Sequence, residues 1–162
     1  MKIILVDDDP LALEGITHML HWERFGGELV GSATNGKEAV ALLHAHHPDV
    51  VISDIRMPVM DGLELAKYIF ENNFHARMIL LSGHSEFEYA QRALHYHVTD
   101  YILKPVTRSK LNHFEERLIA LQQELSADSP PWCVVDEALR TRVGELLRKG
   151  DMASMAELLI SQ

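Results

Sequence analysis

Short runs of apolar residues alternate along the chain with longer stretches in which apolar residues recur at helical spacing. The stretch after the first run, for example, carries Leu13, Ile16 and Leu20 on one face of a helix. Such alternation is typical of an α/β protein in which helices cover both faces of a parallel sheet. We expect strands at 2–6, 29–33, 50–53, 78–81 and 98–103, and helices at 10–21, 37–47, 62–72, 85–94 and 107–125. These elements predict a doubly wound, five-stranded parallel sheet.

The composition changes after this pattern ends. The stretch Ser-Ala-Asp-Ser-Pro-Pro-Trp at 126–132 is unfavourable for helix and is typical of a linker. Residues 136–162 follow with two short helical patterns, which can bury too little surface to fold alone. We therefore expect a domain at 1–125, a linker at 126–135 and a C-terminal helical segment at 136–162. That segment would connect to an output domain outside this sequence or mediate dimerisation.

Composition and charge narrow the possible functions. Apolar residues make up 47% and charged residues 24% of the 162 residues, which is the balance of a globular protein. The net charge of −9 disfavours direct binding of nucleic acid and suits a divalent cation or a basic partner. No apolar run is long enough to span a membrane, and the first residues do not resemble a secretion signal. The single cysteine, Cys133, excludes an internal disulfide and agrees with a cytoplasmic location.

Polar residues follow four of the expected strands at the point where each strand ends: Asp7, Asp8, Asp54, Ser82 and Lys104. The carboxyl ends of parallel strands lie on one edge of the sheet, and ligands bind at that edge. The five side chains are therefore expected to converge on one shallow pocket.

The chemistry of this set points to phosphoryl transfer. Neighbouring carboxylates repel unless a cation neutralises them, and oxygen ligands alone favour Mg²⁺. Lys104 adds a fixed positive charge and Ser82 a hydroxyl donor, which a transferring phosphoryl group needs. The expected nucleophile is a carboxylate, because these strand ends carry no cysteine or histidine; the product would be an aspartyl phosphate.

Four segments, at 6–10, 53–62, 81–83 and 101–105, resemble the receiver domain of two-component response regulators. The resemblance covers about residues 1–125. It implies the flavodoxin-like strand order 2-1-3-4-5, the order already described for a member of this family.

The resemblance also implies roles for the acidic residues. Asp54 would accept the phosphoryl group from a sensor histidine kinase. Asp8, Asp54 and the backbone carbonyl of Arg56 would bind Mg²⁺, and Asp7 would assist through a water molecule.

Other roles implied by the resemblance concern the switch. Ser82 would hydrogen-bond to the phosphoryl group, and Lys104 would form an ion pair with it. Tyr101 would be the switch aromatic, and Pro105 would follow a cis peptide bond. The face made by the fourth helix, fifth strand and last helix would change shape on phosphorylation and could form a homodimer.

Two bulky residues are expected to set the phosphorylated lifetime. In the family, the positions of Arg56 and His84 flank the attacking water, so these side chains should slow hydrolysis. Two departures from the commonest family pattern are mild: Asp9 stands where glutamate is frequent, and Ser82 where threonine is frequent.

Segments 56–65 and 81–90 are most similar to receivers of regulators that carry an AraC-type DNA-binding domain. This similarity implies a transcriptional output, with DNA bound by a domain outside this sequence. A complete stand-alone protein acting as an interaction or relay module is the alternative.

A metal-dependent phosphatase of the haloacid dehalogenase type is a second class of function, because Asp7-x-Asp9 after the first strand mimics its signature. Against it, Leu11 replaces the usual threonine or valine, and no cap domain of useful size is present. A receiver-like module that is never phosphorylated is a third class, disfavoured because the acidic residues, hydroxyl and lysine are all present.

Two further patterns have simpler structural explanations. The pairs His18/His21 and His44/His47 favour a solvated helix face over zinc, which needs three or four ligands. Apolar residues at heptad spacing in the last expected helix favour packing on the sheet over a coiled coil, because too few heptads are present. These apolar residues are Leu111, Phe114, Leu118, Leu121 and Leu125.

Overall fold

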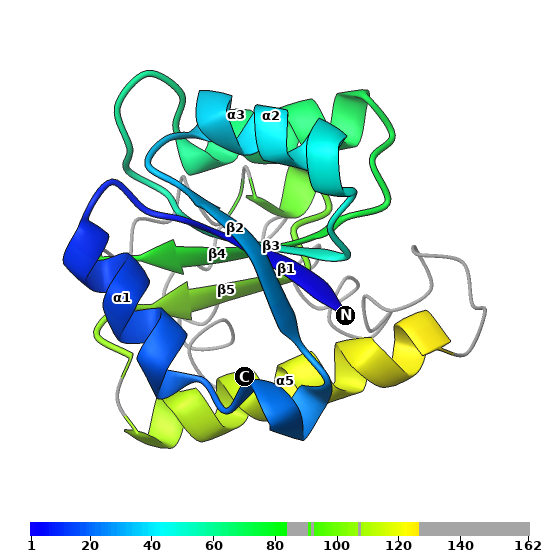
Figure 1. Ribbon diagram of the computed structural model, residues 1–162. Helices are drawn as coiled ribbons and strands as arrows, with labels where there is room; N and C mark the ends of the chain where they lie inside the picture. Colours follow the sequence, from blue (N-terminus) through cyan, green and yellow to red (C-terminus); the bar gives the residue numbers. More distant parts are fainter. Residues whose placement is uncertain (84–90, 92, 107, 127–162) are drawn as a thin grey trace, which may run out of the picture.

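The computed structural model describes residues 1–83, 91, 93–106 and 108–126. Within these residues, five strands form one sheet in the order β2-β1-β3-β4-β5, and every neighbouring pair is parallel (Figure 1). The strands are β1 (Lys2–Val6), β2 (Glu28–Ala33), β3 (Val50–Asp54), β4 (Arg77–Ser82) and β5 (Asp100–Leu103). The helices are α1 (Pro10–Met19), the 3-10 helix η1 (Trp22–Phe25), α2 (Gly36–His46), α3 (Gly62–Glu71) and α5 (Arg108–Ser126). The predicted fold class and strand order are confirmed.

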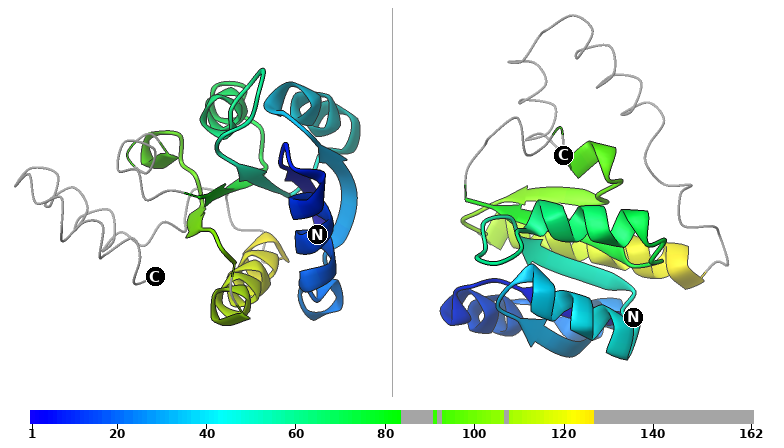
Figure 2. Two further views of the ribbon diagram at one scale, coloured as in Figure 1. Left: turned by 90° about the vertical axis from the view of Figure 1, so that its left-hand side faces the viewer. Right: turned by 90° about the horizontal axis from the view of Figure 1, so that it is seen from above.

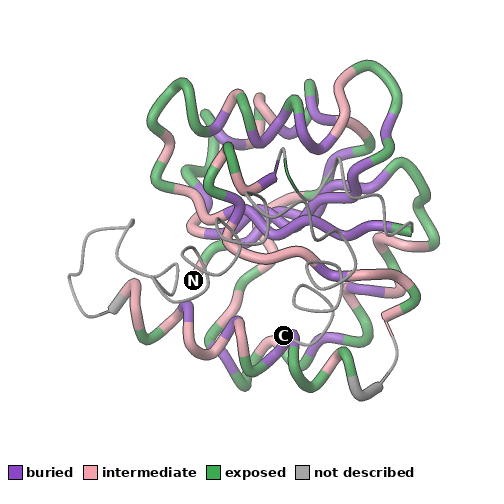
Figure 3. The backbone as a smooth tube through the Cα atoms, turned by 180° about the vertical axis from the view of Figure 1, so that it is seen from behind, coloured by how far each residue is buried: buried purple, intermediate pink, exposed green. Residues whose placement is uncertain are grey.

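Helices cover both faces of the sheet, as Figure 2 shows from two directions. Helices α2 and α3 pack on one face, and α1 and α5 pack on the other. Residues of β1 alternate between these layers: Ile4 and Val6 face α2 and α3, whereas Ile3 and Leu5 face α1 and α5. Burial on both faces explains why the central strands β1, β3 and β4 are mostly continuous apolar runs, and Figure 3 shows the buried core along the sheet.

Helix α5 packs on the sheet as predicted. Phe114, Leu118 and Leu121 are at most 1% exposed and belong to the cluster that includes Ile16 and Leu20 of the α1 region. Its apolar repeat is therefore part of the core. Among the described residues, no helix is long and apolar enough to cross a membrane.

The chain between α1 and β2 differs from the prediction. Helix α1 ends at Met19, before the predicted end at 21, because Leu20 has an extended backbone. The unpredicted helix η1 then turns Phe25 into the core, where it is 2% exposed. Gly26 follows in the left-handed region with φ 59°, which glycine adopts at little cost. The early end of α1 and the turn of η1 together allow both Leu20 and Phe25 to be buried.

Several predictions concern residues outside those described. Of the helix predicted at 85–94, residues 91, 93 and 94 are helical, and the others are not described. The predicted linker at 126–135, apart from Ser126 at the end of α5, and the helices at 136–162 also lie outside the described residues.

Candidate functional site

The carboxyl ends of four neighbouring strands place the predicted site residues on one edge of the sheet. Asp54 is the last residue of β3 and pairs with Leu81 of β4; Ser82 pairs with Leu103, which precedes Lys104. A hollow of about 210 Å³ opens at this edge, and the residues that line it are Asp54, Ile55, Arg56, Ser82, Gly83 and Lys104. The topology thus gathers residues that are far apart in sequence.

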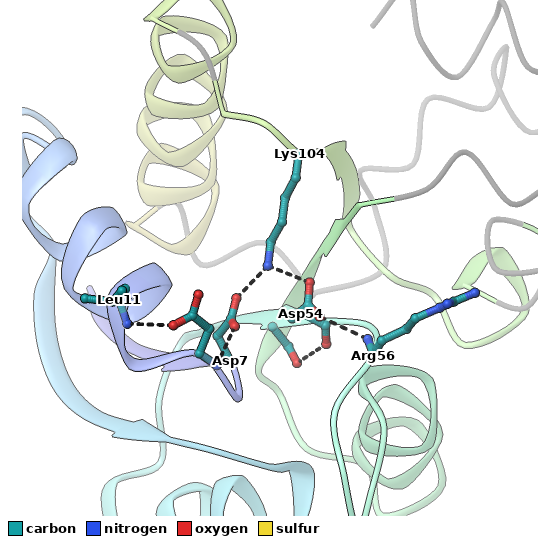
Figure 4. Close-up of polar contacts among 7 residues, drawn as sticks. Asp7, Leu11, Asp54, Arg56 and Lys104 are labelled. Carbon is teal, nitrogen blue, oxygen red and sulfur yellow. Dashed lines mark hydrogen bonds and ion pairs between the residues drawn. The ribbon is translucent and has the colours of Figure 1, made fainter.

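The side chain of Lys104 lies between two carboxylates (Figure 4). Its Nζ is 2.6 Å from Oδ2 of Asp7 and 2.7 Å from Oδ1 of Asp54. Asp7 is 2% exposed and Asp54 is 8% exposed, so little water reaches either acid. Buried carboxylates are costly unless they are paired and hydrogen-bonded. The ammonium group of Lys104 supplies that pairing.

The two acids in turn alter the titration of Lys104. Burial by itself disfavours the charged ammonium, but hydrogen bonds to Asp54 and Asp7 and the negative charges of both outweigh it. The pKa of Lys104 is consequently raised above its ordinary value. The lysine therefore stays charged at neutral pH.

The three consecutive aspartates after β1 occupy different environments. Oδ1 of Asp7 accepts a hydrogen bond of 3.0 Å from the backbone N–H of Asp9. The Asp9 side chain caps α1 by accepting from Leu11 N–H at 2.9 Å. Asp8 is exposed. The structure thus brings Asp7, and not Asp8, into contact with Lys104.

The residues after β3 hold the Asp54 carboxylate from its other side. The backbone N–H of Arg56 donates to Oδ2 of Asp54 at 3.1 Å, and the Arg56 side chain is exposed. The hydroxyl of Ser53 donates to the backbone carbonyl of Asp54 at 2.8 Å. One oxygen of Asp54 thus meets Lys104 and the other meets the β3–α3 loop.

The two predicted switch residues, Ser82 and Tyr101, differ in how far they are buried. Ser82 is buried at the end of β4 and lines the hollow, whereas Tyr101 is half-buried in β5. The backbone N–H of Tyr101 donates to Oδ1 of Asp100 at 2.8 Å. The peptide between Lys104 and Pro105 is cis, as expected. His84 lies outside the described residues.

Two lining residues were not predicted. Ile55 and Gly83 each directly follow a site residue, so their place at a strand end was the available signal. Within the described part of the chain, no group of three His, Cys, Asp or Glu residues is arranged to hold a metal ion. The acids that meet are a pair, Asp7 and Asp54, joined by Lys104.

The fold and the site together define a flavodoxin-like domain with its polar site at the carboxyl edge of the sheet. The family model of the response regulator receiver domain matches residues 3–114, and the chain belongs to this family. It therefore contains the receiver domain of a two-component system, a signalling module rather than a metabolic enzyme. This membership favours the receiver over the phosphatase alternative.

Similar proteins include two transcriptional regulators. The uncharacterized transcriptional regulatory protein YesN of Bacillus subtilis is 41% identical over 119 residues, which span 74% of this chain and 32% of that protein. The transcriptional regulatory protein HptR of Staphylococcus aureus is 34% identical, over 73% of this chain and 46% of HptR. The chain thus spans a third to a half of the length of these relatives.

Solved receiver structures agree with the fold. The receiver domain of AraT, a response regulator from Geobacillus stearothermophilus, has a TM-score of 0.70 at 36% identity, covering 78% of this chain and 96% of that one. The CheX–CheY complex with BeF3 and Mg²⁺ from Borrelia burgdorferi contains a similar chain, with a TM-score of 0.66 at 28% identity. That match covers 75% of this chain and 88% of the other.

Proposed function

We propose that Asp54 accepts a phosphoryl group from the phosphohistidine of a sensor histidine kinase. A carboxylate oxygen of Asp54 attacks phosphorus, the P–N bond breaks, and the histidine nitrogen keeps the electron pair and takes up a proton. The proposal rests above all on one observation: the ammonium of Lys104 contacts Asp7 and Asp54 at the edge of an open hollow. A fixed positive charge at the acceptor is what an incoming phosphoryl group requires.

The donors at the site suit Mg²⁺. The site offers only oxygen ligands: the carboxylates of Asp7, Asp8 and Asp54 and the backbone carbonyl of Arg56. Two of these carboxylates, Asp7 and Asp54, already pair with one positive charge, that of Lys104. We assign these residues to hold the ion, with Asp7 acting through water. Asp8 is exposed, so its carboxylate is accessible to a cation that arrives from solvent. When bound, Mg²⁺ supplies charge neutralisation for the phosphoryl oxygens.

The remaining residues of the site would then respond to the new group. Lys104 would exchange one carboxylate contact for a phosphoryl oxygen, and the Ser82 hydroxyl would donate to another. The movement of Ser82 would leave space that Tyr101 can fill, changing the surface near β5 and α5. A phosphoryl group, with about −1.5 to −2 charge at neutral pH, is sufficient to bias such a two-state element.

The partners and output of the whole protein are part of the same proposal. The similar regulators YesN and HptR are described as transcriptional regulatory proteins, and both are longer than the match. We propose a sensor histidine kinase as phosphodonor and control of transcription, of AraC type, through a DNA-binding domain outside this sequence. Homodimers would form through the β5–α5 face or the C-terminal segment.

Acetyl phosphate with Mg²⁺ provides the direct test of Asp54. Intact-mass spectrometry should show one added phosphoryl group on the wild-type chain and on Asp49→Asn, but none on Asp54→Asn. Asp49 is a matched control because it directly precedes β3, at the opposite edge of the sheet from Asp54. Its Oδ2 accepts from Lys2 N–H, which an amide oxygen also can do.

Peptide mapping identifies the labelled residue. Label on Asp54 supports the receiver mechanism, whereas label on Asp7 with turnover of a phosphate ester would support the phosphatase alternative. Labelling of Asp54→Asn at the wild-type rate would refute the assignment of Asp54.

Beryllofluoride, a phosphoryl analogue, tests the switch. With Mg²⁺ present, it should shift the NMR resonances of Tyr101 and leave those of Tyr68 unchanged. Tyr68 contacts Phe74 and His44 of α2, so it lies on the side of α3 that faces α2. Unchanged Tyr101 resonances at saturation would rule out the proposed switch.

A further inference from the structure

The short connection between β2 and α2, residues 33–36 and here called the β2–α2 turn, contacts both segments that carry the acidic site. The carbonyl of Ala33 accepts a hydrogen bond of 3.1 Å from the backbone N–H of Asp7. The backbone N–H of Gly36 donates to the carbonyl of Met60 at 3.0 Å. One turn, itself without a predicted role in the site, therefore connects the β1–α1 and β3–α3 loops.

The β3–α3 loop, residues 55–61, contains a residue in an unfavourable backbone conformation. Its base is closed by Gly62 N–H donating to the Ile55 carbonyl at 2.8 Å, and its far end by Met60 N–H donating to the Pro58 carbonyl at 2.8 Å. Between Pro58 and Met60, Val59 has φ 69°, a left-handed conformation that is unfavourable for a β-branched residue. Val59 is 77% exposed, so its side chain gains little from packing. Strained residues persist where the surrounding structure holds them.

Gly36 makes the contact with Met60 possible because it has no side chain. A Cβ at Gly36 would lie 2.8 Å from the Met60 carbonyl oxygen and 2.8 Å from its Cγ. Side-chain atoms can turn away from such a clash, but the carbonyl oxygen moves only with the loop backbone. Gly36 does not need glycine for its φ, so close approach is the reason for glycine here.

We propose that Gly36 is a positioning residue for the phosphoacceptor site. By holding Met60, it sets the position of the loop whose Arg56 N–H contacts Asp54 and whose Arg56 carbonyl would bind Mg²⁺. The inference rests on the proposed function, because it concerns the same cation. Its consequence is that a change in the β2–α2 turn alters Mg²⁺ affinity although no residue of the turn binds the ion.

Side-chain hydrogen bonds connect the turn to the first residues of α2. The Asn35 side chain accepts from Glu38 N–H at 3.0 Å. The Glu38 carboxylate accepts from both the N–H and the hydroxyl of Thr34 at 2.9 Å. Because Thr34 and Glu38 are exposed and Asn35 is only half-buried, these contacts can be removed without opening the core.

Titration of the full chain with Mg²⁺, followed by the amide resonances of Arg56 and Gly62, measures the effect without any phosphotransfer. Gly36→Ala should raise the dissociation constant about tenfold or more, the size expected when a group that orients a metal ligand is lost. Gly31→Ala is the matched control on β2. The atoms nearest to a Cβ there belong to the flexible Leu42 side chain, at 3.1 Å, so thermal stability can change while Mg²⁺ affinity stays at the wild-type value.

A second variant tests the same inference in case Gly36→Ala does not fold. The double variant Asn35→Ala/Glu38→Ala loosens the turn from its exposed side and should raise the Mg²⁺ dissociation constant in the same direction. An unchanged dissociation constant in this double variant, or in a folded Gly36→Ala, overturns the inference. If the wild-type chain shows no Mg²⁺-dependent shift, or if Asp54→Asn is still phosphorylated, it is the proposed function that fails.

Discussion

At the scale of single residues, Glu115 is a charged side chain whose burial the sequence pattern did not predict. It lies on α5 and is fully buried. Its carboxylate accepts from the backbone N–H of His21 at 2.9 Å, contacts Nδ1 of His21 at 2.7 Å and pairs with Arg24. His21 is exposed, as predicted, but it lies beyond the end of α1, where it joins α5 to the chain before β2.

These contacts predict a pH-dependent contribution to stability. Burial alone would raise the pKa of Glu115, but the hydrogen bonds from His21 and the charges of His21 and Arg24 lower it below its ordinary value. The stabilisation is therefore present above the unfolded pKa of about 4.3 and is lost as pH falls through the lower folded pKa.

Glu115→Gln tests this contribution. At pH 7 it should lower the free energy of unfolding by about 1.5–3 kcal/mol, the range for hydrogen bonds to charged groups. Urea denaturation at neutral and acidic pH measures the loss, which should shrink on acidification. The exposed neighbour Glu116→Gln is the control and should show no comparable loss. A pH-independent difference would contradict the role of the charge.

At the scale of elements, the start of α3 packs closely against Asp54, the proposed phosphoacceptor. Asp61 and Glu64 form a capping box, so this helix begins at a defined residue. Gly62 follows directly, and a Cβ there would lie 2.2 Å from the backbone carbonyl oxygen of Asp54. Helix α3 can approach the end of β3 this closely only with glycine at its first position.

Gly62→Ala should therefore cost about 1–3 kcal/mol of unfolding free energy, the range for overpacking. It should also reduce phosphorylation of Asp54 by acetyl phosphate, because the strand end must move. Gly15→Ala in α1 is the matched control. A Cβ there meets nothing within 4 Å, so this variant should gain about 0.5–1 kcal/mol from helix propensity. Equal stabilities of the two variants would contradict the packing argument.

At the scale of the whole molecule, one sheet separates two apolar layers, and α5 completes the second of them. Phe114, Leu118 and Leu121 of α5 contact the same cluster as Ile3 and Leu5 of β1. The first and last described elements are thus joined through the core. This arrangement supports the predicted domain boundary near residue 125, which remains a prediction.

A fragment of residues 1–126 should consequently unfold in one cooperative thermal transition, measured by circular dichroism. A fragment of residues 1–106 should not fold, since removal of α5 exposes the apolar side chains of β1 and β3 that α5 covers. A non-cooperative transition for residues 1–126 would show that the domain needs the chain beyond α5.

Much of the site could be predicted from the sequence because of one rule of sheet topology. Residues that end parallel strands share an edge, so Asp7, Asp54, Ser82 and Lys104 could be grouped without coordinates. The sequence did not show which of the two neighbouring acids, Asp7 or Asp8, contacts Lys104. Asp7 and Asp8 are chemically alike and adjacent, and only the course of the backbone after β1 buries one and exposes the other.

By itself, the sequence determined the α/β class, most strand and helix positions among the described residues, and which polar residues lie at the sheet edge. Periodicity and residue type are local properties, and both can be read directly along the sequence. Tertiary structure alone decided that Glu115 reaches His21, that Gly36 touches Met60, and that Lys104 bridges Asp7 and Asp54. These contacts join residues from different elements, and their distances depend on how the helices and strands pack.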